Sequence, residues 1–145
     1  MNVVVDDHLL LQVLLGDEPA DLRTPGARIF TTGLWYHRLC RAVAQDSVTG
    51  AMSRILGRAE PAVAAAAVRD VTGLPDHVGL LSLRDLSWPM ARLVTGGSRL
   101  NLLSLEALAA ADQLAAELCL APADRNRPLL HAAASSGVPV RLVAP

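Results

Sequence analysis

The chain begins MNVVVDDHLLLQVLL (residues 1–15), where two aspartates separate a β-branched run from a leucine-rich run. The run NVVV (2–5) predicts a short buried strand, because its β-branched residues are consecutive and do not alternate with polar ones. The run 8–16 predicts a helix that follows at once. Carboxylates are rarely buried without a partner or a metal. Asp6 and Asp7 therefore mark either the edge of a metal site or a helix cap at the end of the strand.

The rest of the chain alternates between strand-like and helix-like segments. Further strands are expected at 27–31, 77–83 and 138–143, with a short fourth segment at 120–124. Helices are expected at 33–45, 84–97, 105–120 and 127–137, and two short helices within 47–73. This order predicts an α/β fold with a mostly parallel central sheet flanked by helices on both faces. Since no stretch resembles a long linker, residues 1–145 are predicted to form a single domain.

The composition limits the classes of function. Apolar residues make up 52% of the chain and aromatic residues 3%, so Leu, Val and Ala must fill the core. A net charge of −1 argues against a broad nucleic-acid-binding surface, although it leaves room for a local basic patch. Every basic residue apart from histidine is an arginine, which favours planar partners such as phosphate and carboxylate.

The same features predict a cytoplasmic protein. Cys40 and Cys119 both lie in apolar runs and are expected to be reduced, buried thiols. The N-terminus has no basic segment ahead of its apolar run, so no signal peptide is expected. No stretch reaches the roughly 18 apolar residues that a membrane helix needs, and no membrane association is expected.

Acidic residues are expected to meet at one edge of the sheet. Ligands of parallel sheets bind beyond the carboxyl ends of the strands, where Asp6 and Asp124 are predicted to lie. Glu106 is expected in the first turn of the helix that leads into the fourth segment. Glu106 and Asp124 each have a simpler alternative role. Glu106 follows the expected cap Ser104, and its negative charge in the first turn would interact favourably with the helix dipole. Asp124 could cap the next helix. His8 is interpreted as structural, as most lone histidines beside apolar residues are.

Three stretches resemble the PIN domain, a nuclease fold best known in toxins of bacterial toxin–antitoxin pairs. VVVDDHLLLQVLLG (3–16) resembles the opening strand, aspartate and leucine-rich helix of that family. LSLEALAAADQLAAEL (103–118) resembles its helix with an acidic residue before Ala-Leu. APADRNRPLLHAAASSGVPVRLV (121–143) resembles its closing pattern. Each motif alone is unspecific, and the resemblance rests on their order and spacing.

The resemblance implies a cluster of carboxylates that holds Mg²⁺ or Mn²⁺ and activates water against a phosphodiester. Carried over by position, Asp6, Glu106 and Asp124 fill three of the acidic places and are the expected catalytic and metal-binding residues. Glu106 stands where the family more often has Asp, and Asp7 stands where a small hydroxyl residue is usual. The resemblance also implies a homodimer, an RNA target and an antitoxin-like protein partner.

The remaining acidic place falls on Arg38, and residues 28–45 contain no Asp or Glu that a shift of register could bring there. A guanidinium among carboxylates pairs with them and repels a divalent cation. Arg38 is therefore predicted to replace the metal as the counter-ion. Two other carboxylates do not substitute for the missing one: Asp112 points to the wrong face of its helix, and Asp46 lies about two turns beyond Arg38. Asp7 is the only near candidate, and its side chain is expected to point away from that of Asp6 if the strand continues.

Three functions remain open from the sequence. The first is a PIN-like protein of toxin–antitoxin descent with an incomplete metal site, little or no nuclease activity and a role in binding protein or RNA. The second is an active Mg²⁺- or Mn²⁺-dependent ribonuclease that uses Asp6, Glu106 and Asp124. The third is a non-catalytic α/β domain that binds a protein partner and needs no metal. The residue at position 38 separates the first function from the second.

Overall fold

The computed structural model describes residues 1–45 and 50–144, and these form an α/β fold with a five-stranded parallel sheet. The strands are β1 (Val3–Val5), β2 (Ile29–Thr32), β3 (Val78–Leu81), β4 (Glu117–Leu120) and β5 (Val140–Leu142). The helices are α1 (Asp7–Leu14), α2 (Gly33–Ala44), α3 (Ala51–Arg58), α4 (Pro61–Thr72), α5 (Leu83–Thr95), α6 (Leu102–Gln113) and α7 (Arg127–Ser136). The predicted fold class is confirmed, and the architecture is consistent with a PIN-like domain.

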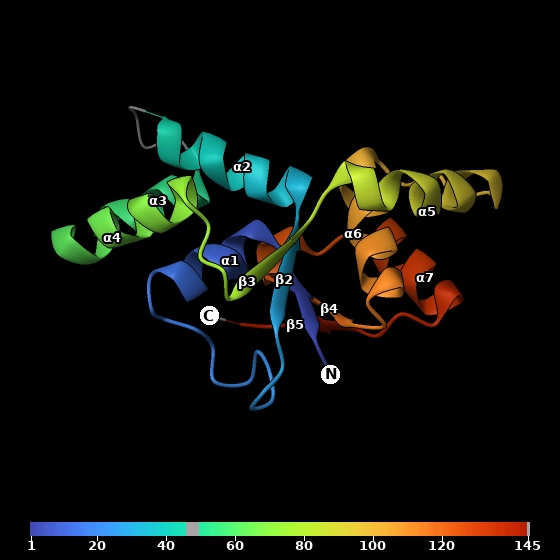
Figure 1. Ribbon diagram of the computed structural model, residues 1–145, viewed down its shortest axis with the longest axis horizontal. Coiled ribbons are helices and arrows are strands. Elements are labelled where there is room, and N and C mark those ends of the chain that lie inside the picture. The colour runs from blue at the N-terminus through green and yellow to red at the C-terminus, as the bar shows by residue number, and fades with distance from the viewer. Residues whose placement is uncertain (46–49, 145) are drawn as a thin grey trace.

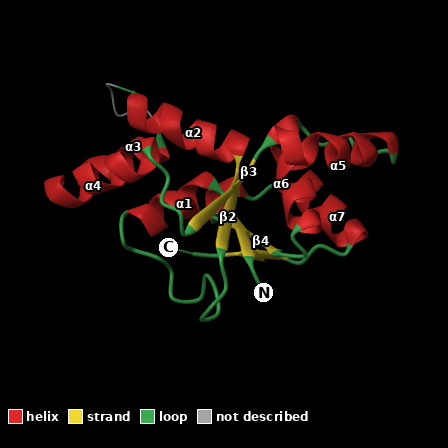
Figure 2. Ribbon diagram, viewed as in Figure 1, coloured by secondary structure: helices red, strands yellow, loops and turns green. Residues whose placement is uncertain are grey.

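Helices cover both faces of the sheet (Figures 1 and 2). Helices α1 to α4 lie on one side of the strands and α5 to α7 on the other. The side chains of β1 show why: Val3 and Val5 pack into a core with α1, whereas Val4 packs into a second core with α6 and α7. A strand buried on both faces must be apolar throughout, which accounts for the run of three valines.

The strand order β3-β2-β1-β4-β5 creates a crevice at the centre of the sheet. The chain leaves β1 toward β2 and β3 on one side, and later returns to β4 and β5 on the other. Ligand sites in such sheets lie at this reversal, outside the carboxyl ends of the two central strands. Val5 at the end of β1 pairs with Cys119 near the end of β4. Residues that follow either strand are therefore brought to the same crevice.

The predicted elements agree with the structure except around the fourth strand. Residues 105–120 were expected to be one helix and 120–124 the fourth segment, but α6 ends at Gln113 and β4 occupies Glu117–Leu120. The helix stops because Ala115 adopts a left-handed conformation (φ 46°), after which the chain turns back to pair with β1. Residues 122–124 form a short 3₁₀ turn.

Two smaller expectations meet different outcomes. The expected cap Ser104 is not the cap of α6: Asn101 takes that place and its side chain accepts the Ser104 N–H at 2.8 Å. The two short helices expected within 47–73 are present as α3 and α4, and residues 46–49, including Asp46, lie outside the described residues. None of the helices described is long and apolar enough to cross a membrane.

Candidate functional site

Asp6 connects β1 to α1 and to the chain after β4. It is fully buried and is the N-cap of α1, where Oδ1 accepts the Leu9 N–H at 2.9 Å. Its Oδ2 accepts the Ala121 N–H at 2.6 Å. Burial raises the pKa of Asp6 to about 7, with smaller contributions from Asp124 and Asp7, while the two N–H donors lower it. The capping role that the sequence left open for Asp6 is thus confirmed, and both oxygens already have partners.

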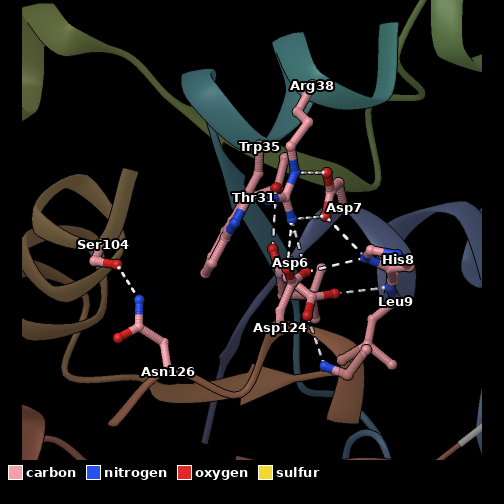
Figure 3. A network of polar contacts seen from close by, with 12 residues as sticks. Asp6, Asp7, His8, Leu9, Thr31, Trp35, Arg38, Ser104, Asp124 and Asn126 are labelled. Atoms are coloured by element: carbon pink, nitrogen blue, oxygen red, sulfur yellow. Dashed lines mark hydrogen bonds and ion pairs between the residues drawn. The ribbon is translucent and has the colours of Figure 1, made fainter. Parts of the chain in front are cut away.

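Asp7 is the first residue of α1, and its carboxylate faces α2 (Figure 3). The side chain is fully buried, and Arg38 donates to it with two groups: Nε to Oδ2, and Nη2 to Oδ1 at 2.6 Å. Such a two-point contact is the geometry that a guanidinium and a carboxylate favour. Because the strand ends at Val5 and the helix starts at Asp7, Asp7 turns toward the same crevice as Asp6.

Arg38 also reaches Asp124, which follows β4. Its Nη2 lies 2.8 Å from Oδ1 and 2.7 Å from Oδ2 of Asp124. Hydrogen bonds from His8 and Arg38 hold the pKa of Asp124 well below its usual range, against the opposing effect of burial. Hydrogen bonds to Asp7 and Asp124 in turn raise the pKa of Arg38 above its ordinary value. The guanidinium therefore bridges two carboxylates that come from opposite ends of the sequence.

His8 is the second cation of the cluster. Its Nδ1 lies 3.0 Å from Oδ2 of Asp124 and 3.2 Å from Oδ1 of Asp7. These hydrogen bonds raise the pKa of His8 to about 10, so the imidazole is protonated at neutral pH. Three carboxylates thus face two cations, and the partial protonation of Asp6 brings the net charge of the cluster between −1 and zero.

The side chain of Glu106, a residue of α6, reaches the start of α2 and serves a different purpose. It is fully buried, and its Oε2 accepts the Leu34 N–H at 2.9 Å. A carboxylate there accepts a hydrogen bond from one of the free N–H groups of the first turn. Its negative charge also interacts favourably with the positive end of the α2 dipole. A Cβ at Gly33 would lie 3.4 Å from Oε1 of Glu106, which is an ordinary van der Waals contact. That oxygen is buried without a hydrogen-bond partner among the described residues.

The donor set fits a divalent metal poorly in this arrangement. Asp6, Asp7, His8 and Asp124 each offer a ligand atom, and these atoms all lie within 4.8 Å of one another. Mg²⁺ and Mn²⁺ prefer oxygen ligands with negative charge. Here Asp7 and Asp124 are bonded to Arg38, and His8 carries a proton where a ligand needs a lone pair. A divalent ion at the cluster would have to displace both cations.

The structure brings together only part of the set predicted from sequence. Asp6, Asp124 and Arg38 meet in the crevice, whereas Glu106 accepts the Leu34 N–H in the first turn of α2 and is not among the four residues whose ligand atoms cluster within 4.8 Å. The alternative role of Asp124 as a helix cap does not hold, because Asn126 caps α7 through the Leu129 N–H.

Two members of the cluster were not in the expected metal-binding set. Asp7 is a candidate for the edge of the site from the sequence, but a continued strand would point its side chain away from Asp6; β1 ends at Val5, so the side chain turns toward the cluster. His8 was interpreted as structural, and its partner Asp124 is 116 residues away. The signal that could have found both is the run of three polar residues Asp-Asp-His between two apolar segments.

Compared with protein-family models and with curated proteins, the sequence matches none.

Proposed function

We propose that this chain is a PIN-like domain, related to the toxin–antitoxin ribonucleases, whose acidic site is neutralised from within by Arg38 and does not support metal-dependent cleavage. One observation carries the proposal: the Arg38 guanidinium bonds both Asp7 and Asp124, on the helix position where the family pattern expects a carboxylate. The domain then acts by binding RNA or a protein partner. It is a cytoplasmic protein and forms a homodimer.

The charges support this proposal over an active ribonuclease. A metal held by Asp7 and Asp124 would lie close to the Arg38 guanidinium. At about 4 Å and an effective dielectric constant of about 20, a divalent ion and a single positive charge repel each other by about 8 kcal/mol. Arg38 could swing into solvent to relieve this repulsion, since its side chain is 35% exposed. That movement would remove the partner of the buried Asp7, which is itself costly.

Mn²⁺ binding to Arg38 variants tests the proposal by calorimetry. Arg38→Glu removes the cation and places a shorter carboxylate on the same face of α2, which leaves space for an ion between positions 38, 7 and 124. We expect measurable Mn²⁺ binding in Arg38→Glu, weaker binding in Arg38→Gln and the weakest in the parent chain. Arg84→Glu is the matched control, because it makes the same charge change at an exposed position of α5.

Cleavage of single-stranded RNA with Mn²⁺ is measured in parallel. The proposal expects no metal-dependent cleavage by the parent chain. A parent that binds Mn²⁺ tightly and cleaves RNA would refute it and favour the active ribonuclease. If Arg38→Glu folds and gains no more affinity than Arg84→Glu, the guanidinium is not what excludes the metal.

A further inference from the structure

A cavity of about 450 Å³ lies beside the acidic cluster, between the start of α2 and the starts of α6 and α7. Its wall includes Trp35, Arg38, Asn101, Asp124, Arg125 and Arg127. In Figure 3 the indole of Trp35 lies on the side of Arg38 that faces Ser104 and Asn126, two further residues of the wall. This volume is in the range of sites for small molecules.

Hydrogen-bond donors dominate this wall. Arg125 and Arg127 are exposed, and neither guanidinium forms an ion pair with any residue that the structure describes. Arg38 uses Nε and Nη2 for its carboxylates, and Nη1 takes no part in those contacts. The one acidic side chain of the wall is Asp124, which is already paired with Arg38 and His8. A ligand that fits here must supply acceptors and negative charge.

Two further features of the wall point the same way. The Trp35 side chain is buried, with 2% of its surface exposed, and its Nε1–H has no partner in the described part of the chain. A buried donor without an acceptor is costly, so a ligand that supplies one is favoured. The cavity also lies at the N-terminal ends of α6 and α7, next to their caps Asn101 and Asn126, where the helix dipoles favour an anion.

We propose that this cavity binds the phosphate monoester group of a small phosphorylated molecule. Its donors are Nη1 of Arg38, the guanidinium groups of Arg125 and Arg127, and the indole N–H of Trp35. These residues belong to α2, to the turn after β4 and to α7, and all of them line the same cavity. A tetrahedral oxyanion offers oxygens to several directions at once, whereas a carboxylate offers two oxygens in one plane. The remaining volume accommodates the organic part of the molecule.

The cavity shares Arg38 and Asp124 with the acidic cluster, but the proposed site is tested through Arg125 and Arg127, neither of which forms an ion pair with the cluster in the described part of the chain. The two proposals can therefore fail independently. If the Arg125 and Arg127 variants lose phosphate binding, Arg38 itself is unchanged. The Mn²⁺ titration of Arg38→Glu then still tests the exclusion of metal.

Nuclear magnetic resonance of the full chain gives a direct readout. The sequence has two tryptophans, Trp35 and Trp88, so a ¹⁵N-labelled sample shows two indole N–H signals, which Trp88→Phe assigns. Trp88 is 74% exposed on α5 and serves as an internal reference. On titration with adenosine 5′-monophosphate we expect a saturable shift of the Trp35 signal and none of the Trp88 signal. Inorganic phosphate should produce the same shift with lower affinity, and acetate should not.

Variants of the exposed arginines locate the site. The double variant Arg125→Gln/Arg127→Gln should weaken nucleotide binding by about tenfold or more, because each substitution removes a charge-assisted hydrogen bond. Arg84→Gln, which loses an exposed arginine outside the cavity, should not change the affinity. Trp35→Phe keeps the aromatic ring and removes the donor, and a several-fold loss is expected.

Four outcomes would overturn the proposal. These are no shift of the Trp35 signal at millimolar nucleotide, equal binding by the double arginine variant, equal binding of acetate, and binding only of an oligonucleotide that lacks a terminal phosphate. The last would assign the cavity to the backbone of a nucleic-acid strand.

Discussion

The substitution Asp7→Asn changes the free energy of unfolding in opposite directions for an internal ion pair with Arg38 and for a metal site without its metal. In Asp7→Asn the shape of the side chain is kept and its charge removed. If Asp7, Asp6 and Asp124 form a metal site without metal, the substitution relieves repulsion between like charges and stabilises the protein. If Arg38 is the counter-ion, the substitution takes one partner from a buried pair and destabilises it. We expect destabilisation.

The magnitude follows from the burial of the two partners. Breaking a fully buried pair costs about 3–5 kcal/mol. Asp7 is fully buried, but the Arg38 side chain is 35% exposed and keeps its contacts with Asp124, so water and Asp124 compensate part of the loss. The expected decrease in the free energy of unfolding is about 2–3 kcal/mol, of which the lost charge at the start of α1 contributes up to about 1 kcal/mol. For a chain of this length the melting temperature should fall by about 6–10 °C.

Urea unfolding of the parent, Asp7→Asn, Arg38→Met and the double variant measures this effect as a double-mutant cycle. The cycle isolates the coupling between the two side chains from the loss of charge at the helix start. Asp112→Asn, at an exposed position of α6, is the matched control and should change the free energy of unfolding by less than about 0.5 kcal/mol. An Asp7→Asn variant that is more stable than the parent, or a coupling energy near zero, would refute the ion-pair argument.

Three further predictions concern pH and the neighbouring carboxylates. The pKa of His8 is raised to about 10, above its ordinary value of 6.5, so its ion pairs stabilise the fold fully below pH 6.5 and lose their effect as the pH rises through 10. His8→Gln should flatten this part of the curve of melting temperature against pH, and an unchanged curve would contradict the assignment. The pKa of Asp6 is raised from 3.8 to about 7, so its contribution is present below pH 3.8 and lost as the pH rises through 7. Asp6→Asn should remove that slope in urea unfolding between these values, and an unchanged slope would show that Asp6 is not its source. Glu106→Ala should lower the free energy of unfolding by about 2–3 kcal/mol, because it leaves the Leu34 N–H unpaired and a void behind, whereas Glu106→Gln keeps an acceptor and should cost less than about 1 kcal/mol. Equal losses in the two Glu106 variants, measured by thermal denaturation, would mean that the charge and not the hydrogen bond is what α2 requires.

Local patterns predicted most of the fold because its strands and helices have strong local signals. The valines of β1, the leucines of α1 and the Pro-Val-Arg-Leu run near β5 are each consistent with one element only. The error at β4 has a local cause. AAELCL (115–120) consists largely of good helix formers, and the turn that ends α6 uses Ala115 in a left-handed conformation where Gly or Asn would be expected. Pairing with β1 across more than a hundred residues decided the strand, and that contact has no local signature.

The candidate site was predictable where it depended on strand ends and unpredictable where it depended on side-chain direction. Asp6 and Asp124 follow strands that the topology makes neighbours, and the absence of an acid in residues 28–45 indicated Arg38. The role of Glu106 depends on a hydrogen bond to Leu34, 72 residues away, which spacing along its own helix does not reveal. The direction of Asp7 depended on where the strand ended, a boundary that sequence patterns fix only to within a few residues.

Carboxylates gathered in a crevice must be balanced by a metal, by protons or by cations of the chain itself. This cluster shows two of these three solutions. Burial raises the pKa of Asp6 until its carboxylate is partly protonated at neutral pH, and Arg38 with His8 balances Asp7 and Asp124. Each solution weakens the attraction for a divalent ion, because a nearly neutral cluster no longer offsets the cost of dehydrating the ion. The crevice therefore gathers carboxylates whose charges favour a fixed ion pair over a divalent ion.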